Sequence, residues 1–343
     1  MGKGRYIFLF GILGILLLLC FLGDLFLGSV NIPVNELLSI LISGKSSQTE
    51  WITIVQDFRI PRAITAVLAG LSLSLAGLQM QTVFRNPLAG PYVLGISSGA
   101  SLGVAILVMG AYILFPGRDF NFQTGGIITA AWLGSGMIML LLLLVSFRIK
   151  DIMTILILGI LFGSITIAFV SILQYFTHET LLKTFIVWTL GSLGNVTRVQ
   201  LPVLAGSLGL GVILSVLSIK ILNAMLLGEN YARSVGINVM MGRILLFIST
   251  SILAGTVTAF CGPIGFIGIA VPHIARLIWK TADHRILIPA VMGVGAIILL
   301  ISDMISQLPG SDRLLPINSV TALIGIPVVV WIVVRNQRFA NLS

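Results

Sequence analysis

Residues 152–176 read IMTILILGILFGSITIAFVSILQYF, a run of twenty-five residues that contains no charged side chain. A helix crosses the hydrocarbon core of a bilayer with about 20 apolar residues, because it rises about 1.5 Å per residue and the core is about 30 Å thick. This stretch is therefore predicted to be a transmembrane helix. Apolar runs of similar length recur along the chain, so the same interpretation extends to most of the sequence.

The overall composition supports an integral membrane protein. The chain has 343 residues, of which 57% are hydrophobic and 9% are charged, and its mean hydropathy is +1.11. A soluble domain carries about a quarter charged residues to cover its surface. These figures exclude a soluble enzyme, a disordered chain and a coiled coil. The two cysteines, Cys20 and Cys261, are too few for a disulfide framework.

We predict an all-α fold with ten transmembrane helices. A shorter apolar piece at 185–193 is predicted to be a re-entrant or interfacial helix, because it is too short to span. The first apolar run is expected to be an uncleaved helix, since it is too long for a signal peptide and no cleavage site follows it. The ten predicted crossings are 6–27, 63–83, 93–115, 125–147, 152–176, 201–222, 243–260, 265–279, 286–306 and 320–334.

The basic residues predict the orientation. With ten crossings, thirteen of the 20 Lys and Arg residues lie on the side of both termini and seven on the other. Short cytoplasmic loops carry the excess of Lys and Arg, so both termini are predicted to be cytoplasmic. The formal net charge of +9 is therefore a topology signal, and no nucleic-acid partner is expected.

Charged residues are scarce inside the predicted spans. Five charged residues lie near helix ends, where their side chains are expected to reach water, namely Asp24, Asp151, Arg243, Arg276 and Asp303. Secondary transporters usually place an ionisable residue in mid-membrane. Its absence predicts that the energy for transport comes from another chain. We expect no catalytic residue, no cofactor and no metal site in this one.

The sequence Gly44-Lys45-Ser46-Ser47 imitates the end of a phosphate-binding loop. Such a loop needs a glycine five residues before its last glycine, and that position is Ser39. The predicted topology also places this segment outside the cell, away from ATP. We therefore expect no nucleotide site here.

Small residues recur at four-residue spacing in two of the predicted helices. Gly95, Gly99 and Gly103 lie on one face of the first helix, and Gly159 and Gly163 repeat the pattern in another. Small residues at this spacing let helix backbones approach closely in lipid. The stripes favour either packing inside one bundle or a smooth wall beside a pore or dimer contact.

Two polar segments are candidates for partner binding. The loop after the sixth crossing, 226–238, suggests two short helices that break at Gly236, with Glu229 near the start of the first. It fits either docking into a groove of a soluble partner or a plain amphipathic surface helix. Arg59 and Arg62 share a helix face and suit either a partner's carboxylates or interfacial snorkelling.

Five motifs in order resemble the FecCD-type permeases, the transmembrane subunits of type II ABC importers for iron-siderophores, haem and cobalamin. The similarity runs from about residue 55 to the C-terminus. The motifs are Arg59-Ile60-Pro61-Arg62; Arg85-Asn86-Pro87-Leu88-Ala89 with Gly95 and Gly99; Leu227-Gly228-Glu229 with Ala232 and Gly236; Gly262-Pro263-Ile264-Gly265-Phe266 followed by Pro272-His273 and Arg276; and Asp283-His284-Arg285 with the later Leu315-Pro316 and Gly325-Ile326-Pro327.

The resemblance implies a single permease domain over residues 1–343, with a coupling loop at about 226–238. It implies a homodimer in the inner (plasma) membrane, two copies of a cytoplasmic ATP-binding subunit and an extracytoplasmic binding protein. The chain would move its cargo inward by alternating access and would not itself be an enzyme.

The resemblance also implies roles for individual residues, carried over by position. Binding-protein docking is assigned to Arg59, Arg62 and Arg313. The cytoplasmic gate is assigned to Asp151 and Ile152. Contact with the ATPase is assigned to Leu227, Gly228, Glu229, Ala232, Arg233 and Gly236.

The sequence departs from the family pattern at three places. Gln307 stands where members often carry a third docking arginine, four residues after Asp303, and Arg313 is the expected substitute. Asn318 replaces a glycine. The gate turn lacks the usual small hydroxyl residues.

Three other interpretations remain open at this stage. An ion-gradient-coupled secondary transporter would work without an ATPase subunit. A membrane-embedded, lipid-modifying enzyme would need His or carboxylate residues clustered at one depth, and the three histidines are scattered. His273 and His284 are either structural residues of the family motifs or metal ligands.

Overall fold

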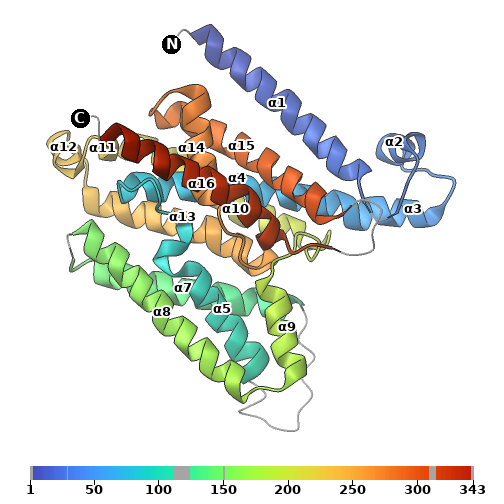
Figure 1. The fold of residues 1–343 in the computed structure, drawn as a ribbon, viewed down its shortest axis with the longest axis horizontal. Helices are drawn as coiled ribbons and strands as arrows, with labels where there is room; N and C mark the ends of the chain where they lie inside the picture. Colours follow the sequence, from blue (N-terminus) through green and yellow to red (C-terminus); the bar gives the residue numbers. More distant parts are fainter. Residues whose placement is uncertain (1–2, 29, 111–123, 150, 309–313, 341–343) are drawn as a thin grey trace. The chain divides into compact units, whose positions relative to one another are not determined.

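The computed structural model describes residues 3–28, 30–110, 124–149, 151–308 and 314–340. All regular structure in these ranges is helical, which confirms the predicted all-α class. Figure 1 labels the helices along the chain, and the chain groups into two compact units. Unit 1 is Met1–Ser74, Ser192–Gly206 and Ile264–Ser343, and unit 2 is Leu75–Gly191 and Ser207–Pro263.

Two helices, α4 and α10, contribute residues to both units. The helices of unit 1 are α1 (Lys3–Phe26), α2 (Val34–Ser43), α3 (Thr49–Thr53), η1 (Ile54–Arg59), most of α4 (Ile60–Val83), the start of α10 (Leu201–Leu217), α14 (Ile267–Trp279), α15 (His284–Ser306) and α16 (Ile317–Ala340). Unit 2 holds the remainder of α4 and α10, with η2 (Pro91–Leu94), α5 (Ile96–Ala105), η3 (Ile106–Gly110), α7 (Thr124–Ser146), α8 (Ile152–Phe176), α9 (Glu179–Thr189), α11 (Ile219–Leu226), α12 (Glu229–Ser234) and α13 (Val239–Cys261).

Six helices in the described residues are long and apolar enough to cross a membrane. A seventh span results if α10 and α11, which bend by 53° at their junction, cross together. Three more of the predicted crossings correspond to shorter apolar helices, namely Ile96–Gly110, Ile267–Trp279 and Ile317–Trp331. The count of ten therefore stays a prediction.

Three predicted boundaries are wrong. The second long helix is continuous from Thr49 to Val83, whereas the sequence predicts its start at residue 63. The third crossing is interrupted, because Gly95 has a φ of +73° and separates the 3-10 turn η2 from α5. The short helix α9 begins at Glu179, six residues before the predicted 185. In each case polar or glycine residues interrupt the apolar pattern, so a prediction based on hydropathy does not give the helix its observed bounds.

Capping side chains set the beginnings of two helices. The Asn238 side-chain oxygen accepts a hydrogen bond from the Met241 amide at 3.1 Å at the start of α13. The Asp283 carboxylate accepts one from the Arg285 amide at 2.9 Å at the start of α15. Each satisfies one of the amides that the first turn of a helix leaves without a backbone partner.

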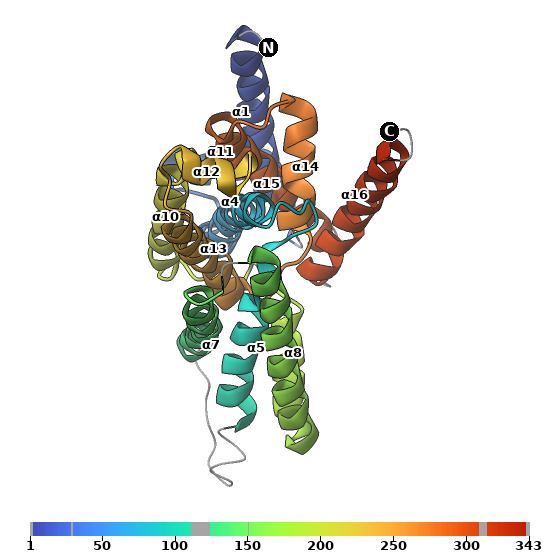
Figure 2. The same cartoon turned by 90° about the vertical axis from the view of Figure 1, so that its left-hand side faces the viewer.

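In unit 2, α5 lies between α7 and α8 (Figure 2). Glycines make the close approach to α7 possible. A Cβ atom at Gly99 would lie 2.6 Å from the Gly134 carbonyl oxygen, and one at Gly103 would overlap the Ala130 carbonyl oxygen. The contact confirms that this glycine stripe packs helices within the bundle.

The second glycine stripe packs against the beginning of the first. A Cβ atom at Gly159 of α8 would lie 2.6 Å from the Val93 carbonyl oxygen, and one at Gly163 would lie 3.7 Å from the Gly95 Cα. Gly95 itself needs its left-handed backbone conformation, which side chains other than glycine adopt at a cost. The two stripes therefore hold the η2–α5 corner against α8.

A buried polar cluster joins α4, α10 and α13 in unit 2. The Gln79 amide donates to the hydroxyls of Ser215 at 2.6 Å and Ser249 at 3.0 Å. Its carbonyl oxygen accepts from the Thr250 hydroxyl at 2.8 Å. All four residues are fully buried. Hydrogen bonds between helices replace, in lipid, part of the attraction that the hydrophobic effect supplies in water.

In unit 1, α4 packs directly on α15. A Cβ atom at Gly70 would overlap the backbone of Gly295, and the Ser74 hydroxyl donates to the Val291 carbonyl at 2.9 Å. This contact fixes the register of α4, which carries Arg62, against α15, which carries Asp303.

We predict that Gly134→Ala will destabilise the α5–α7 contact, because its Cβ would overlap the Gly99 carbonyl oxygen. The expected cost is about 1–3 kcal/mol, as for overpacking in other tightly packed cores. Gly136→Ala is the matched control on the same helix, since its Cβ would meet no atom within 4 Å. Thermal unfolding in detergent should show a lower midpoint for the first variant only. Equal midpoints would contradict the packing argument.

Candidate functional site

Arg59 holds the end of α1. Its guanidinium donates to the carbonyl oxygens of Leu25 at 2.8 Å and Phe26 at 3.2 Å, and also to that of Val30. These are carbonyls that the last turn of a helix and the chain beyond it leave without a backbone donor. Arg59 is only 7% exposed, so interfacial snorkelling is wrong for this residue. Its docking role stays a prediction.

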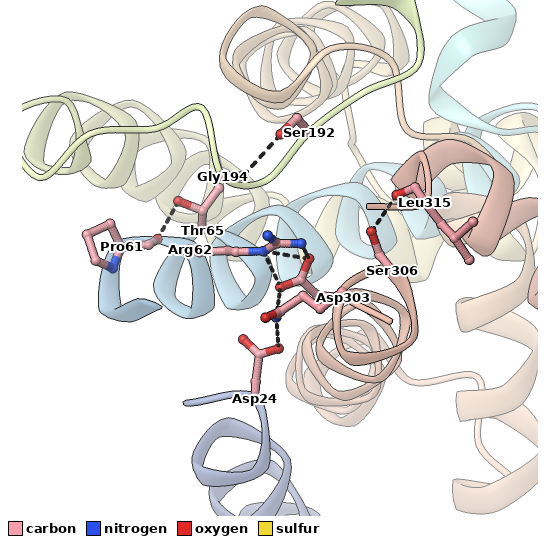
Figure 3. A network of polar contacts seen from close by, with 10 residues as sticks. Asp24, Pro61, Arg62, Thr65, Ser192, Gly194, Asp303, Ser306 and Leu315 are labelled. Atoms are coloured by element: carbon pink, nitrogen blue, oxygen red, sulfur yellow. Dashed lines mark hydrogen bonds and ion pairs between the residues drawn. The ribbon is translucent and has the colours of Figure 1, made fainter. Parts of the chain in front are cut away.

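Arg62 forms a two-pronged ion pair with Asp303 of α15 (Figure 3). Its Nε lies 2.8 Å from Asp303 Oδ2, and its Nη2 lies 2.8 Å from Oδ1. The side chains of Arg62 and Asp303 are 17% and 1% exposed. A planar guanidinium matches a carboxylate in this geometry, so the pair fixes both position and direction.

Gln307 extends this network to α1. Its amide donates to Asp24 Oδ1 at 3.1 Å and to Asp303 Oδ2 at 3.0 Å. Asp24 and Asp303 are 2% and 0% exposed, so the expectation that both reach water is wrong. The Gln307 amide therefore joins a carboxylate of α1 to a carboxylate of α15 inside the protein.

A cavity of about 400 Å³, here called the arginine pocket, borders this network. Arg59 and Arg62 both line it, and exposed Phe58 and Leu314 form part of its wall. Arg59 makes its hydrogen bonds with neutral carbonyls, so its charge contributes a positive potential to the pocket. The third predicted docking residue, Arg313, lies outside the described residues. The remaining lining residues are Gly28, Val30, Ile54, Ser192, Gly194, Asn195 and Gln307.

Unit 2 holds the second candidate region, the predicted coupling loop. It forms the six-residue helix α12, flanked by Gly228 with a φ of +106° and Gly236 with a φ of +82°. Glu229, the first residue of α12, accepts hydrogen bonds from Arg243 Nε at 3.0 Å and from Arg243 Nη2. Its other oxygen lies 3.7 Å from Arg233 Nη2.

Arg243 is a functional candidate that sequence reasoning missed. It lies in the first part of α13 and is 2% exposed, whereas it is predicted to reach water. The loss of hydration of a buried guanidinium is offset only by close partners, and Glu229 is one of them. Nothing in the local sequence pattern indicates the pairing.

Three exposed apolar side chains, here called the apolar stripe, lie on and beside α12. Leu227 is 65% exposed, Tyr231 46% and Val235 52%; Tyr231 belongs to α12, and Leu227 and Val235 lie just before and just after it. Ala232 faces inward and is fully buried. An exposed apolar stripe on a short helix suits insertion into a groove on another protein.

Asp151, assigned to the gate, caps the start of α8. Its carboxylate accepts hydrogen bonds from the Thr154 hydroxyl at 2.6 Å and the Thr154 amide at 2.8 Å. These bonds, with a smaller contribution from the Met153 amide and the Arg243 charge, hold the pKa of Asp151 below its ordinary value. Ile152, the first residue of α8, is half-buried.

A cavity of about 350 Å³, here called the corner pocket, lies beside these residues. It joins the end of α7, α12 and the start of α13. Its lining residues are Ser146, Phe147, Ile149, Arg233, Ile237, Asn238, Val239, Met240 and Arg243.

The other family motif positions have local structural partners. The Asn86 side-chain oxygen accepts from the Leu88 amide at 2.9 Å, which closes a turn around Pro87. The Asn318 side-chain oxygen accepts from the Gly265 amide at 2.9 Å, so this departure from the family pattern ties the start of α16 to the chain before α14.

The histidines of the later motifs lie in unit 1. Pro272 is buried within α14, and His273 and Arg276 are half-buried on the same helix. His284 is fully buried at the start of α15. Among the residues that the structure describes, no three His, Cys, Asp or Glu side chains are grouped so that they could hold a metal ion.

The long apolar helices of the described residues are typical of a multi-pass membrane protein. The family model of the FecCD transport family matches residues 16–335, and the chain belongs to this family. The resemblance seen in the sequence motifs is thereby confirmed.

Two relatives and one solved structure illustrate the similarity. The vitamin B12 import system permease protein BtuC of Klebsiella pneumoniae is 36% identical over 330 residues, which cover 96% of this chain and 94% of the relative. The hemin transport system permease protein HmuU of Yersinia pestis is 33% identical over 338 residues, 98% of each chain. A metal-chelate type ABC transporter, solved in an inward-facing conformation, has a TM-score of 0.83 and 28% identity, and covers 96% of this chain and 99% of its own.

Membership of this family establishes the general role of the chain. The chain is a multi-pass membrane protein and a transport permease subunit of an ABC importer, not an enzyme. ATP is hydrolysed in a separate subunit, and importers of this family work with ATP-binding and substrate-binding proteins.

We predict that Arg62→Gln and Asp303→Asn will each cost about 3 kcal/mol, because each leaves its partner buried without a countercharge. The double variant should cost less than the sum, since the two residues interact directly. Asp57→Asn is the control, because Asp57 is half exposed and lies 4.0 Å from exposed Arg198; its effect should stay within about 0.5 kcal/mol. Denaturation in mild detergent measures all four. Additive costs in the double variant would contradict the pairing.

We also predict that the Thr154 amide chemical shift will titrate with Asp151 at a pH below the ordinary aspartate value of 3.8. A lowered pKa means that the cap is fully formed above the unfolded-state pKa and is lost as the pH falls through the folded-state pKa. Asp151→Asn should abolish the titration while keeping the cap, because asparagine caps helices equally well. A midpoint at or above the ordinary value would show that the cap does not hold the carboxylate.

Proposed function

We propose that this chain moves a metal chelate, an iron-siderophore, haem or cobalamin, from an extracytoplasmic binding protein into the cytoplasm. Alternating access, driven by a separate ATPase, would carry the cargo across. The observation that carries the proposal is α12, a short helix with an exposed apolar stripe whose first residue is anchored by Arg243. Relatives named for vitamin B12 and hemin transport support the cargo class.

In the proposed topology the chain crosses the membrane ten times with both termini in the cytoplasm. Seven spans, counting α10 and α11 as one, and the three shorter apolar helices make up the ten. The excess of basic residues on the terminal side supports the orientation. It places α12 and the turn at Asp151 in the cytoplasm and the arginine pocket on the outer side.

In the proposed assembly, residues 1–343 form one permease domain whose loop at about 226–238 contacts the ATPase. Two copies of the chain pair in the inner membrane with two ATP-binding subunits. A binding protein delivers the cargo from outside. The alternative of an ion-gradient-coupled carrier would need none of these partners.

Docking of the binding protein is proposed at the arginine pocket. Arg59, whose hydrogen-bond partners are neutral carbonyls, supplies positive potential there, and carboxylates on the partner would be attracted to it. Because Arg59 and Arg62 also hold α1 and α15, docking at this pocket would act directly on the helices that these residues connect.

At the cytoplasmic side, closure of the ATPase dimer would move α12, and the turn at Asp151 and Ile152 would respond as the gate. The apolar stripe of Leu227, Tyr231 and Val235 is the surface proposed to enter the ATPase.

The proposal is tested in proteoliposomes that contain this chain with or without the ATP-binding subunit encoded beside it. ATP hydrolysis is measured first, followed by uptake of cyanocobalamin, haemin or ferrichrome with the neighbouring binding protein. Hydrolysis that needs both subunits and rises with the loaded binding protein is expected. Uptake by this chain alone, driven by an ion gradient, would overturn the proposal.

We predict that Tyr231→Asp will lower ATPase stimulation by about tenfold or more, because a charge at the centre of an apolar contact must be desolvated on binding. Tyr231 is exposed, so folding should be unaffected. Lys220→Gln, at an exposed position on α11, is the control and should leave stimulation unchanged. Full stimulation in Tyr231→Asp would show that the ATPase binds elsewhere.

A further inference from the structure

We propose that the corner pocket binds the phosphate group of an anionic phospholipid at the membrane surface. Every residue that lines the pocket belongs to unit 2, and the lining comes from the end of α7, from α12 and from the start of α13. The inference goes beyond the proposed function, because it concerns a ligand other than the cargo and the protein partners. Only the side of the membrane, the cytoplasmic one, is taken from the proposed topology.

The first observation is a buried hydroxyl. Ser146, the last residue of α7, lines the pocket and is 1% exposed. Within the part of the chain that the structure describes, its Oγ atom has no hydrogen-bond partner. On the neighbouring helix α8, by contrast, Ser164 and Ser171 each donate to the carbonyl four residues before them. Because a buried hydroxyl without a partner is costly, Ser146 indicates an acceptor that enters the pocket from outside the chain.

The second observation is the start of α13 at the same pocket. Asn238, Val239 and Met240 all line it, and α13 is a helix of 23 residues. The first turn of a helix leaves amides without backbone partners, and the helix dipole gives this end a positive potential. The Asn238 side chain satisfies the Met241 amide, which leaves the amides of Val239 and Met240 to a ligand. Phosphate groups bind at helix starts for both reasons.

The third observation is an excess of positive charge. Arg233 and Arg243 line the pocket, and both approach one carboxylate, that of Glu229. Arg243 keeps the partners it has in this proposal, because its charge acts on the pocket whether or not its hydrogen bonds are taken. Two guanidiniums against one carboxylate leave one net positive charge. In the turn before α8, exposed Arg148 and exposed Asp151 offset each other.

These groups together fit a phosphate. Its oxygens accept hydrogen bonds in several directions at once, so one phosphate could bind the Ser146 hydroxyl, an amide of α13 and the Arg233 guanidinium. The Arg233 side chain is 56% exposed and lies 3.7 Å from Glu229, which is longer than a hydrogen bond, so it is able to turn to a ligand. A cavity of about 350 Å³ also has room for more than a phosphate ion.

The depth of the pocket and its apolar wall favour a lipid over free phosphate. Both α7 and α13 are long and apolar enough to span a membrane. The pocket lies where α7 ends and α13 begins, which is the depth of phospholipid head groups. Most of the lining residues are apolar, and one of them, Phe147, is 63% exposed. Basic pockets between membrane helices on the cytoplasmic side bind lipid head groups in this way.

The test measures binding to the permease purified with its ATP-binding subunit in detergent, by native mass spectrometry. Dioctanoyl phosphatidylglycerol carries a phosphate and acyl chains, dioctanoylglycerol carries the chains alone, and inorganic phosphate carries no chains. One phosphatidylglycerol per permease chain should bind about tenfold or more tightly than dioctanoylglycerol, because hydrogen bonds to a charged group are the strong ones. Inorganic phosphate should compete only at far higher concentration.

Two variants, Ser146→Ala and Arg233→Gln, should each weaken phosphatidylglycerol binding by about fivefold or more, because each removes a donor to a charged acceptor. Arg285→Gln removes an exposed arginine from the first turn of another helix, α15. It is the matched control and should leave binding unchanged. Dioctanoylglycerol should bind equally to the parent and to all three variants.

Ser146→Ala also separates lipid binding from a structural role. Its hydroxyl is unsatisfied among the described residues, so its removal should leave the thermal midpoint of the lipid-depleted protein equal or higher. Added phosphatidylglycerol should raise the midpoint of the parent, and it should raise that of Ser146→Ala less. A lower midpoint of Ser146→Ala without lipid would show that the hydroxyl has a partner within the protein, and the proposal would fail.

Three binding results would also overturn the proposal. If dioctanoylglycerol binds as tightly as phosphatidylglycerol, the pocket recognises apolar chains and not phosphate. If inorganic phosphate binds as tightly and depends on Ser146, the ligand is a soluble phosphate. If both pocket variants bind phosphatidylglycerol like the parent, the lipid lies elsewhere. Should Arg233→Gln not assemble, Ser146→Ala decides alone. None of these results depends on ATP hydrolysis or uptake, so the proposed function stands or fails separately.

Discussion

Close approach of helices at residues without side chains is the constraint on which this structure depends. Lipid is as apolar as leucine, so helices in a membrane are held by van der Waals contact and by hydrogen bonds between them. The contacts of Gly99 with Gly134 and of Gly70 with Gly295 bring backbones together at distances that a methyl group would prevent. The polar side chains of the candidate site are attached to helices positioned in this way.

The pairing of the buried charges depends on that packing of the helices. Arg62 and Asp303 can meet with two-pronged geometry because α4 and α15 are fixed in register at Gly70, Ser74 and Gly295. Between α13 and α12, Arg243 instead donates through two nitrogens to a single oxygen of Glu229. In both places a guanidinium joins two elements, and breaking the pair would leave a buried charge without its countercharge.

The sequence was sufficient for the helical class and the family, since long apolar runs and five ordered motifs are local signals. The sequence was not sufficient to predict that Asp24, Arg243 and Asp303 are buried, because a charged side chain is buried only where other side chains pair with it in the folded chain. Arg62 and Asp303 are 241 residues apart in the chain. A hydropathy profile compares each residue only with the residues next to it in the sequence, so it cannot show this pairing.

The wrong start predicted for the second long helix has the same cause. Hydropathy places its start at residue 63, because Asp57, Arg59 and Arg62 interrupt the apolar pattern. The helix continues back to Thr49 because other parts of the chain satisfy these side chains. Arg59 is bound by three carbonyl oxygens, and Arg62 is bound by a carboxylate.

That same helix is longer than a bilayer requires. Its 35 residues correspond to about 52 Å at about 1.5 Å per residue, against a hydrocarbon core of about 30 Å. Because 78% of its apolar window is buried inside the protein, its neighbours in contact are mainly other parts of the chain and not lipid. A change in bilayer thickness would therefore act on this helix only through the helices that surround it.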